Sequence, residues 1–184
     1  MKVVFALGIS LITLTGATQT NELPAANAIT TQVETNLLAA RRQQAEAMRA
    51  VCIQGRRSIC GKILQVLPEG LVVESGYTNL LREPLTRSWL VPGTVTASRA
   101  NGLQESSQPG SICIGPVFLT DLPKSRGHKP QRYDYVIIEG YPAGQFTYTS
   151  VGTVQHTVRR FSAQLIKTVD FNLQSTNPPA AGVR

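Results

Sequence analysis

The residues of this 184-residue chain best able to do covalent or acid–base chemistry are three cysteines and two histidines. Cys113, His156 and Asp134 could form a thiol triad, in which a histidine held by a carboxylate activates the thiol. Cys113, however, lies in the apolar stretch SICIGPVFL, and a thiol in apolar surroundings stays protonated and inert. We therefore expect no catalytic residue, and a thiol-dependent enzyme is the last of three functional interpretations.

The three cysteines, Cys52, Cys60 and Cys113, have no spacing typical of a zinc site, so we expect neither a metal nor another cofactor. In an oxidising compartment three thiols allow one disulfide bond. Cys60 and Cys113 occur in similar contexts, SICGK and SICIG, and are the first candidates for it; Cys52 with Cys60 is the second. The alternative is three buried thiols that act as small apolar side chains.

Positive charge dominates the chain, which has a formal net charge of +7 and a pI near 9.7. Such a balance favours anionic partners, because the summed field attracts them to the surface. The densest basic cluster falls in a polar loop between residues 121 and 132. We expect the contact surface to comprise this loop and two arginines of a later strand: Lys124, Arg126, His128, Lys129, Arg132, Arg159 and Arg160. A solvated basic surface without a dedicated partner is the simpler alternative.

The elements that would position these side chains are short, β-branched runs typical of strands. The clearest pair lies in residues 58–75, where two apolar runs flank Pro68-Glu69-Gly70. This chemistry predicts a hairpin whose three-residue loop ends in a glycine bulge at Gly70. Both faces of the first run are partly apolar, so the hairpin must be covered on both sides.

Further strands are predicted up to residue 161, among them residues 133–139, 145–149 and 153–161, with glycine and proline at the bends. Residues 162–172 fit either a strand or a short helix. The predicted fold is mainly β: a small, partly open β-barrel of the OB or SH3-like kind, spanning residues 53–172 and preceded by one N-terminal α-helix. Leu80, Leu81 and Leu85 are expected to plug one end of the barrel, with an apolar binding lip as the alternative.

The N-terminal part reads as a leader followed by a helix. Residues 1–17 have the positive start, apolar run and small residues of a signal peptide, with a retained anchor as the competing interpretation. Residues 18–28 are expected to be a linker, residues 29–52 an amphipathic helix and residues 173–184 a disordered tail. No membrane span is expected after removal of the leader. The predicted location is exported and bacterial: periplasmic, cell-envelope or secreted. The helix would dock on the barrel; the alternative is that it binds a partner or self-associates.

The stretch from the hairpin through SWLVPGTVTAS to EGYPAGQFTYTSVGTV resembles small, uncharacterised, signal-peptide-bearing β-barrel proteins of bacteria. The resemblance covers residues 58–161; it implies an exported barrel and carries no catalytic residue. Our first interpretation is therefore a non-catalytic binding or structural module of the cell envelope, contacting an anionic polymer or a protein subunit through the basic loop. The alternative is an OB-like nucleic-acid-binding protein with bases stacked on aromatic residues. Its aromatic content of 6% and its leader argue against that alternative. The stacking platform would be Tyr133, Tyr135, Phe146 and Tyr148 beside Arg159 and Arg160.

Overall fold

The computed structural model describes residues 23–82, 85, 88–99, 102–125, 127–150 and 153–176. The chain divides into two compact units, residues 1–40 and 41–184. The expected signal peptide, residues 1–17, lies outside the described residues, as do residues 18–22 of the expected linker and residues 177–184 of the expected tail.

Helix α1 spans Leu23–Gln54, so it begins inside the segment expected to be a linker and not at residue 29. Proline is tolerated in a first helical turn, and the alanine-rich sequence that follows Pro24 favours helix. The helix ends at Gln54, and the amide of the following Gly55 donates to the carbonyl of Val51 at 3.0 Å. A Cβ at Gly55 would lie 2.6 Å from Cγ of Pro142, so only glycine permits this close approach to the sheet.

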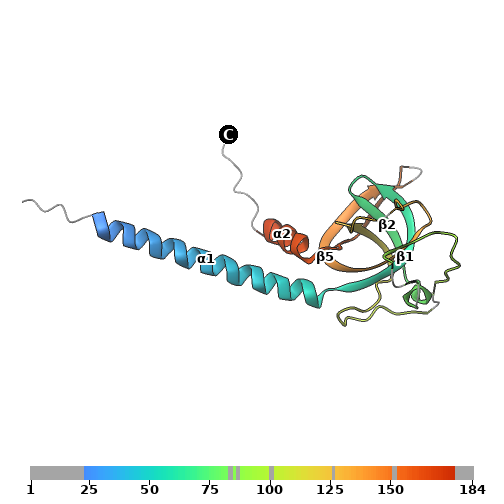
Figure 1. Ribbon diagram of the computed structural model, residues 1–184, viewed down its shortest axis with the longest axis horizontal. Coiled ribbons are helices and arrows are strands. Elements are labelled where there is room, and N and C mark those ends of the chain that lie inside the picture. Colours follow the sequence, from blue (N-terminus) through green and yellow to red (C-terminus); the bar gives the residue numbers. More distant parts are fainter. Residues whose placement is uncertain are drawn as a thin grey trace, which may run out of the picture. The chain divides into compact units, whose positions relative to one another are not determined.

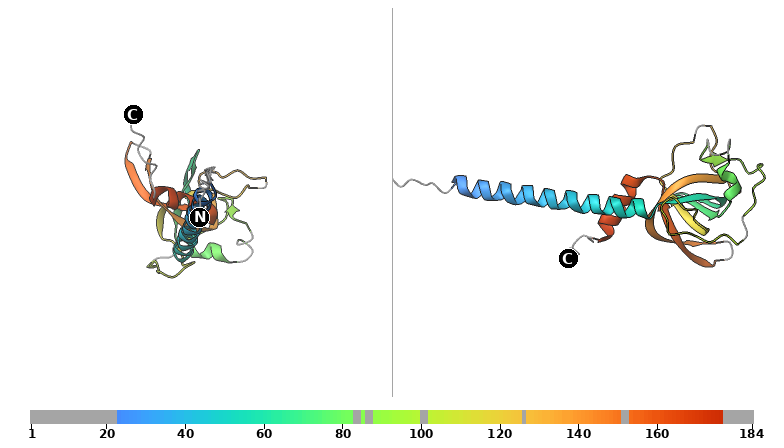
Figure 2. Two further views of the ribbon diagram at one scale, coloured as in Figure 1. Left: turned by 90° about the vertical axis from the view of Figure 1, so that its left-hand side faces the viewer. Right: turned by 90° about the horizontal axis from the view of Figure 1, so that it is seen from below.

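The second unit contains a six-stranded sheet, and the prediction of a mainly β fold is confirmed. Strand pairings run from β1 through β2, β4, β6 and β5 back to β1, so these five strands follow a ring (Figure 1). All pairs in the ring are antiparallel except β4 with β6, and β3 pairs with β5. The turned views in Figure 2 show the same curvature of the sheet. The strands are β1 (Arg57–Leu67), β2 (Gly70–Ser75), β3 (Leu90–Val91), β4 (Gly115–Thr120), β5 (Tyr135–Thr149) and β6 (Gln155–Ser162).

The β1–β2 hairpin forms where predicted, but its predicted loop is wrong. Leu67 pairs directly with Gly70, so the connection is the two residues Pro68 and Glu69. Gly70 is absent from the glycines with positive φ and belongs to strand β2. Its role is steric, because a Cβ there would lie 2.2 Å from the carbonyl oxygen of Leu119 on β4.

Apolar clusters pack on both faces of the hairpin, although Val66 near the end of β1 stays 46% exposed. The cluster inside the ring contains Ile59 and Ile63 of β1. The register of β1 shifts between Ile63 and Gln65, and this bulge places Leu64 and Leu67 together in the outer cluster. An extra residue in a strand reverses the faces of all later side chains, which simple alternation along the sequence does not reveal. The inner cluster is Ile59, Ile63, Leu71, Val73, Leu90, Cys113, Val117, Leu119, Val136 and Phe161.

The expected plug of the barrel end does not form. Leu80 is fully buried, but it packs in a third cluster with Val91 and Tyr135, separate from the interior cluster. Leu80 belongs to the short 3-10 helix η1, Thr78–Leu81, and Leu81 is exposed. Tyr135 precedes the inward-facing Val136, so the segment after β2 covers the outer face of β5.

Helix α2, Leu165–Thr176, resolves the ambiguous segment after β6 in favour of a helix, and it includes residues 173–176 of the expected tail. Ser162 accepts a hydrogen bond from the Gln164 amide at 3.1 Å and also donates to Asp121 at 2.7 Å. These bonds fix the start of the helix against the end of β4. Asn172 donates to the carbonyl of Pro142 at 3.2 Å, which holds the helix against β5.

Candidate binding groove

An open groove of about 700 Å³ lies beside the outer apolar cluster of the barrel. Three chain segments that are distant in sequence form its walls: the second half of β1, the end of the β4–β5 loop and the tip of the β5–β6 hairpin. The groove residues are Leu64, Gln65, Val66, Gln131, Arg132, Tyr148 and Ser150. Two side-chain amides, one guanidinium and one phenol thus surround an aliphatic surface. Such mixed lining suits a ligand with an apolar face and a charged or hydrogen-bonding edge.

Aromatic packing fixes the wall that the β5–β6 hairpin contributes. Phe146 stacks on Phe118 of β4 with 3.6 Å between ring centroids and 10° between ring planes. Tyr148 stacks on His156 at 5.5 Å, and the His156 ring is hydrogen-bonded to the hydroxyl of Ser150 at 3.1 Å. The Tyr148 ring therefore has a defined position in the groove before any ligand binds, which lowers the entropy cost of binding.

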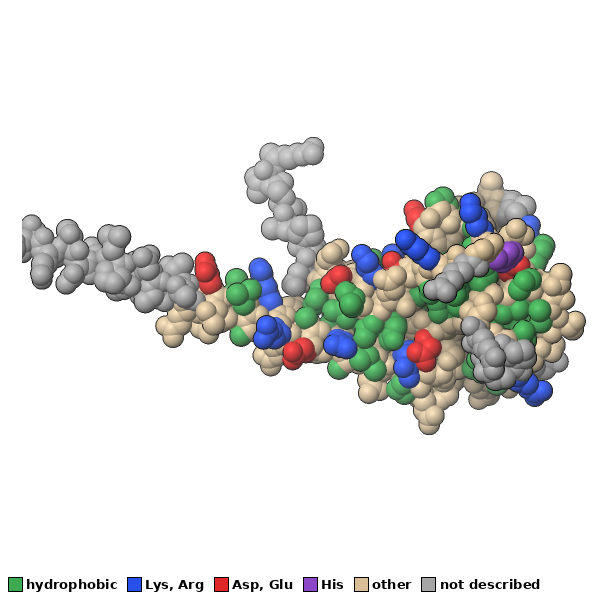
Figure 3. All heavy atoms as spheres, viewed as in Figure 1, with side chains coloured by type: hydrophobic (Ala, Val, Ile, Leu, Met, Phe, Trp, Pro, Cys, Tyr) green, Lys and Arg blue, Asp and Glu red, His purple; other side chains and the backbone are tan. Residues whose placement is uncertain are grey.

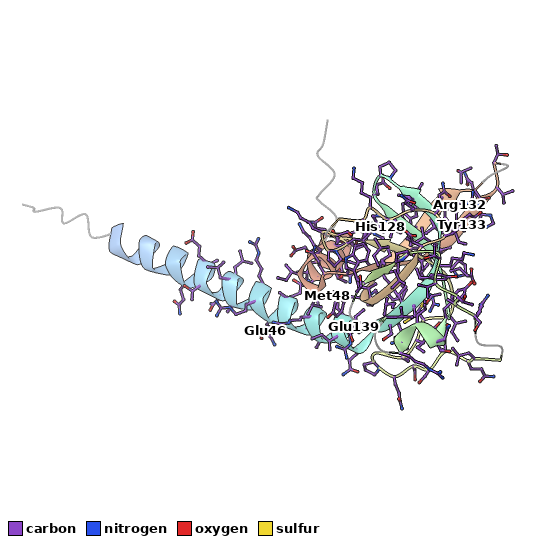
Figure 4. All side chains as sticks on the ribbon, turned by 45° about the vertical axis from the view of Figure 1, so that its right-hand side comes forward. Glu46, Met48, His128, Arg132, Tyr133 and Glu139 are labelled. Carbon is purple, nitrogen blue, oxygen red and sulfur yellow. The ribbon has the colours of Figure 1, made fainter. Side chains whose placement is uncertain are left out.

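Two cations lie against one exposed aromatic ring next to the groove. Tyr133 is 49% exposed, with Lys62 Nζ at 4.9 Å and Arg132 Cζ at 4.8 Å from its ring centroid. Cation–π attraction holds both positive charges at this surface. Arg132 and Tyr133 lie on the side of the barrel that also carries His128 (Figure 4). The result is a paired positive charge at the edge of the groove.

The buried carboxylate of Asp134 anchors the basic loop. One oxygen accepts a hydrogen bond from the Gly93 amide at 3.0 Å. The other lies 2.7 Å from Nε2 of His128 and accepts from the Gln131 amide at 2.9 Å. Tyr133 has φ of 76°, a strained value for a residue with a side chain, and the Asp134 bonds on either side of it hold this conformation.

The other predicted site residues fall in three places. Lys124, His128 and Lys129 line a concavity of about 470 Å³ on the basic loop, with Ser125, Gly127 and Pro130. Arg126 lies outside the described residues. Arg160 stacks over the ring of Phe171 on α2 at 4.6 Å. Arg159 belongs to a further cluster, so the loop residues and the two strand arginines do not share one site.

Arg159 lies on β6 with its side chain 45% exposed, and it contacts Glu105 and Cys113. Its guanidinium donates to the two Glu105 carboxylate oxygens at 2.6 and 2.8 Å and to the Cys113 sulfur at 3.2 Å. Arg57 lies 3.5 Å from the same carboxylate. The hydrogen bond from Arg159 is the largest influence that lowers the pKa of Glu105 below its usual value.

The cysteines are free thiols without activation, and the expected Cys60–Cys113 bridge is not formed. Cys113 belongs to the inner cluster together with Ile59, whereas Cys60 follows Ile59 on β1 and points to the opposite face. Burial raises the pKa of Cys60 to about 12 and that of Cys113 to about 11.

The hypothetical thiol triad does not assemble either. Cys113 contacts Arg159, while Asp134 is bonded to His128. His156 lies on the β5–β6 hairpin, against Tyr148 and Ser150.

Sequence reasoning missed most of the groove. Arg132 and Tyr148 were both singled out, for charge and for stacking, yet as members of different sites. Lys62, Gln65 and Gln131 carried no signal, because only the path of the chain brings β1 next to the β4–β5 loop. The usable clues were the charge of Arg132 and the place of Tyr148 in the predicted stacking platform.

No protein-family model, curated protein or solved structure matches this chain. Among the described residues, neither helix combines the length with the apolar character that a membrane crossing requires. The described part of the chain also contains no cluster of three or more histidine, cysteine or acidic side chains able to hold a metal ion.

Proposed function

We propose that this chain is a non-catalytic binding module that holds an anionic polymer along the groove and the basic loop beside it. The observation that supports this proposal most directly is the arrangement of Lys62 and Arg132 around the exposed Tyr133, next to the groove. Acidic groups of the ligand would meet this paired charge, while its less polar rings or chains would lie on Leu64, Val66 and Tyr148. The cell envelope is the setting we propose, on the strength of the leader-like residues 1–17.

The strand order supports an OB-like assignment within the mainly β class. A five-stranded ring with Greek-key connections is typical of OB barrels, and these bind oligosaccharides and oligonucleotides on the face of their second and third strands and between two hairpin loops. Here the second and third ring strands are β2 and β4, and their outward Val72 and Phe118 belong to the cluster beside the groove. The first and last hairpins of the ring, β1–β2 and β5–β6, flank it. An SH3-like barrel is the alternative assignment.

Long-range electrostatics supports the same ligand class. A net charge of +7 attracts polyanions over distances of about the Debye length, roughly 8 Å at physiological salt. Exposed charges at Lys124, Lys129 and Arg132 lie on one loop, so successive acidic groups of a polymer can engage them in turn. Binding of this type weakens steeply as salt is added, because counterions compete for the same charges.

The test is the affinity of heparin fragments of defined length for two charge-matched variants, over a salt series. Arg132→Glu and Lys167→Glu each change the net charge by the same amount, but Lys167 lies on α2 and lines a different pocket. We expect Arg132→Glu to weaken binding about tenfold, or about 1.4 kcal/mol, and Lys167→Glu to change it less than about twofold. Equal losses in the two variants, or no saturable binding by the unmodified chain, would contradict the proposal.

A second candidate is single-stranded nucleic acid, favoured specifically by the ordered Tyr148 ring in the groove. Base–aromatic stacking contributes about 1–3 kcal/mol per base, so Tyr148→Leu should weaken binding of an oligothymidylate about tenfold or more. The same variant should alter heparin binding much less, because charge dominates there. Tighter binding of oligothymidylate than of a heparin fragment of equal charge, with this dependence on Tyr148, would favour the second candidate over the first.

A further inference from the structure

A second hollow, of about 290 Å³, lies between α1 and α2 within the second unit. Its floor is apolar, and charged side chains form its rim. The lining residues are Arg42, Ala45, Glu46, Arg49, Leu165, Ile166, Val169 and Asp170. We call it the helix groove. It shares no lining residue with the groove of the barrel, and the inference below is independent of the proposed function.

The frame of the helix groove is held by specific contacts. Asn172 of α2 donates to the sulfur of Cys52, a fully buried residue of α1, at 3.4 Å. Thr168, also fully buried, faces the sheet side of α2. The two helices therefore contact each other near Cys52. The helix groove lies on the N-terminal side of this contact, along the α1 residues from Arg42 to Arg49. Such a preformed hollow costs little free energy to occupy.

The helix groove carries an unusually exposed apolar side chain, Ile166. This aliphatic side chain is 76% exposed, the highest value among the large hydrophobic residues described. It stands beside the partly buried Leu165 and Val169. Over α2 and the adjoining turns of α1, Figure 3 shows hydrophobic side chains interspersed with side chains of both charges. Contiguous exposed apolar surface with a charged rim is typical of a protein–protein contact.

The rim charges identify the partner. Arg42 and Arg49 are balanced by Glu46 and Asp170, whereas the chain as a whole carries +7. If the partner were a polyanion or a strongly basic protein, half of these rim charges would face charges of the same sign. A twofold contact sets a surface against itself, so it requires a patch that carries both signs in equal number.

We propose that the helix groove is the contact surface of a homodimer, with Ile166 of each chain inserted into the helix groove of the other. The contact is isologous: the apolar floor is buried about the twofold axis, and Arg42 and Arg49 of one chain approach Glu46 and Asp170 of the other. Dimerisation leaves the barrel groove of each chain open, so a dimer presents two polymer-binding surfaces. Two linked surfaces bind a long polymer more tightly than one surface does.

Sedimentation equilibrium of the full chain between about 1 and 500 µM tests this contact. We expect a reversible monomer–dimer equilibrium in the unmodified chain and at least a tenfold larger dissociation constant for Ile166→Glu. Val154→Glu is the matched control, because Val154 is 54% exposed but lies outside the helix groove. The Val154→Glu variant should dimerise with the dissociation constant of the unmodified chain. Ala45→Arg, which fills the hollow from the α1 side, should abolish dimerisation as Ile166→Glu does. Urea midpoints of all variants report folding separately.

A monomeric unmodified chain at 500 µM overturns the homodimer. Dimerisation of Ile166→Glu and Ala45→Arg with unchanged affinity overturns it equally, because the contact would then lie elsewhere.

Discussion

Glu105 and Arg159, 54 residues apart in the chain, are joined by two parallel hydrogen bonds of 2.6 and 2.8 Å. The bidentate geometry is the strong form of an arginine–carboxylate pair. Glu105 also accepts from the Ile114 amide at 3.1 Å, so this one carboxylate ties the loop before β4 to strand β6. Glu105 thereby stabilises the parallel β4–β6 pairing, which completes the ring, near its first residue pair, Val117 with Arg159.

The first prediction concerns the pH dependence of stability. The pKa of Glu105 is lowered in the folded chain, chiefly by the hydrogen bond from Arg159. Its stabilising contribution is therefore complete above the unfolded-state pKa near 4.5 and is lost as the pH falls through the lower, folded-state pKa. Glu105→Gln should cost about 1–3 kcal/mol of unfolding free energy at pH 7. This difference should shrink when urea unfolding is measured below about pH 4.5, while Glu69→Gln at the exposed β1–β2 turn should show none. A difference that grows on acidification would contradict the assigned role.

The second prediction compares a buried and an exposed aliphatic residue of β1. Ile63 is fully buried in the ring, whereas Val66, three residues later on the same strand, is 46% exposed. Ile63→Ala should destabilise the chain by about 2–5 kcal/mol, because it removes buried methyl groups and leaves a cavity. Val66→Ala should cost less than about 1 kcal/mol. Equal costs in guanidinium unfolding would contradict the difference in burial between Ile63 and Val66.

The third prediction concerns the thiols. With a pKa of about 11, Cys113 is only about one part in a thousand thiolate at pH 8, and Cys60 is lower still. Native protein should therefore resist iodoacetamide at both positions, and intact mass should show no internal disulfide. All three cysteines should react once the chain is unfolded in guanidinium. Rapid labelling of Cys113 in the folded chain would be the contrary result.

The fourth prediction concerns the anchor of the basic loop. Asp134→Asn removes the charge that faces His128 and weakens acceptance from the Gly93 and Gln131 amides. These two amides should exchange with deuterium at least about tenfold faster, since charged acceptors form the stronger bonds. Asp170→Asn, an exposed change on α2, serves as the control. If exchange at Gly93 and Gln131 is unaffected, Asp134 does not hold the loop.

Local chemistry was enough to predict several of the strands, because turn residues and β-branched runs act over short distances. Residues 133–139, predicted as a strand, overlap the first part of β5, and the 58–75 hairpin forms as β1 and β2. Features that depend on the path of the chain were not accessible. Leu80 is apolar wherever it packs, so its sequence alone could not tell an interior plug from a cover over β5.

The candidate site shows the same division. Basic residues of the loop could be singled out from charge density, and Tyr148 as an aromatic residue of the predicted stacking platform. Their meeting with Lys62 and Gln65 of β1 depends on the path of the chain, and the face of Gln65 depends also on the bulge at Leu64, which no turn or glycine signal marks. Arg159 was grouped with the loop for its charge, yet its paired hydrogen bonds to Glu105 assign it to the stability of the ring.

Amide chemical shifts test the polymer-binding groove, the central proposal, most directly. A heparin hexasaccharide is titrated into isotope-labelled chain at low salt, and amide shifts are followed by two-dimensional NMR. We expect saturable changes concentrated on three separate segments, residues 64–66, 131–133 and 148–150, that fit one dissociation constant. Shifts confined to α2, or small unsaturable shifts spread over all exposed basic residues, would contradict a polymer-binding groove on this barrel.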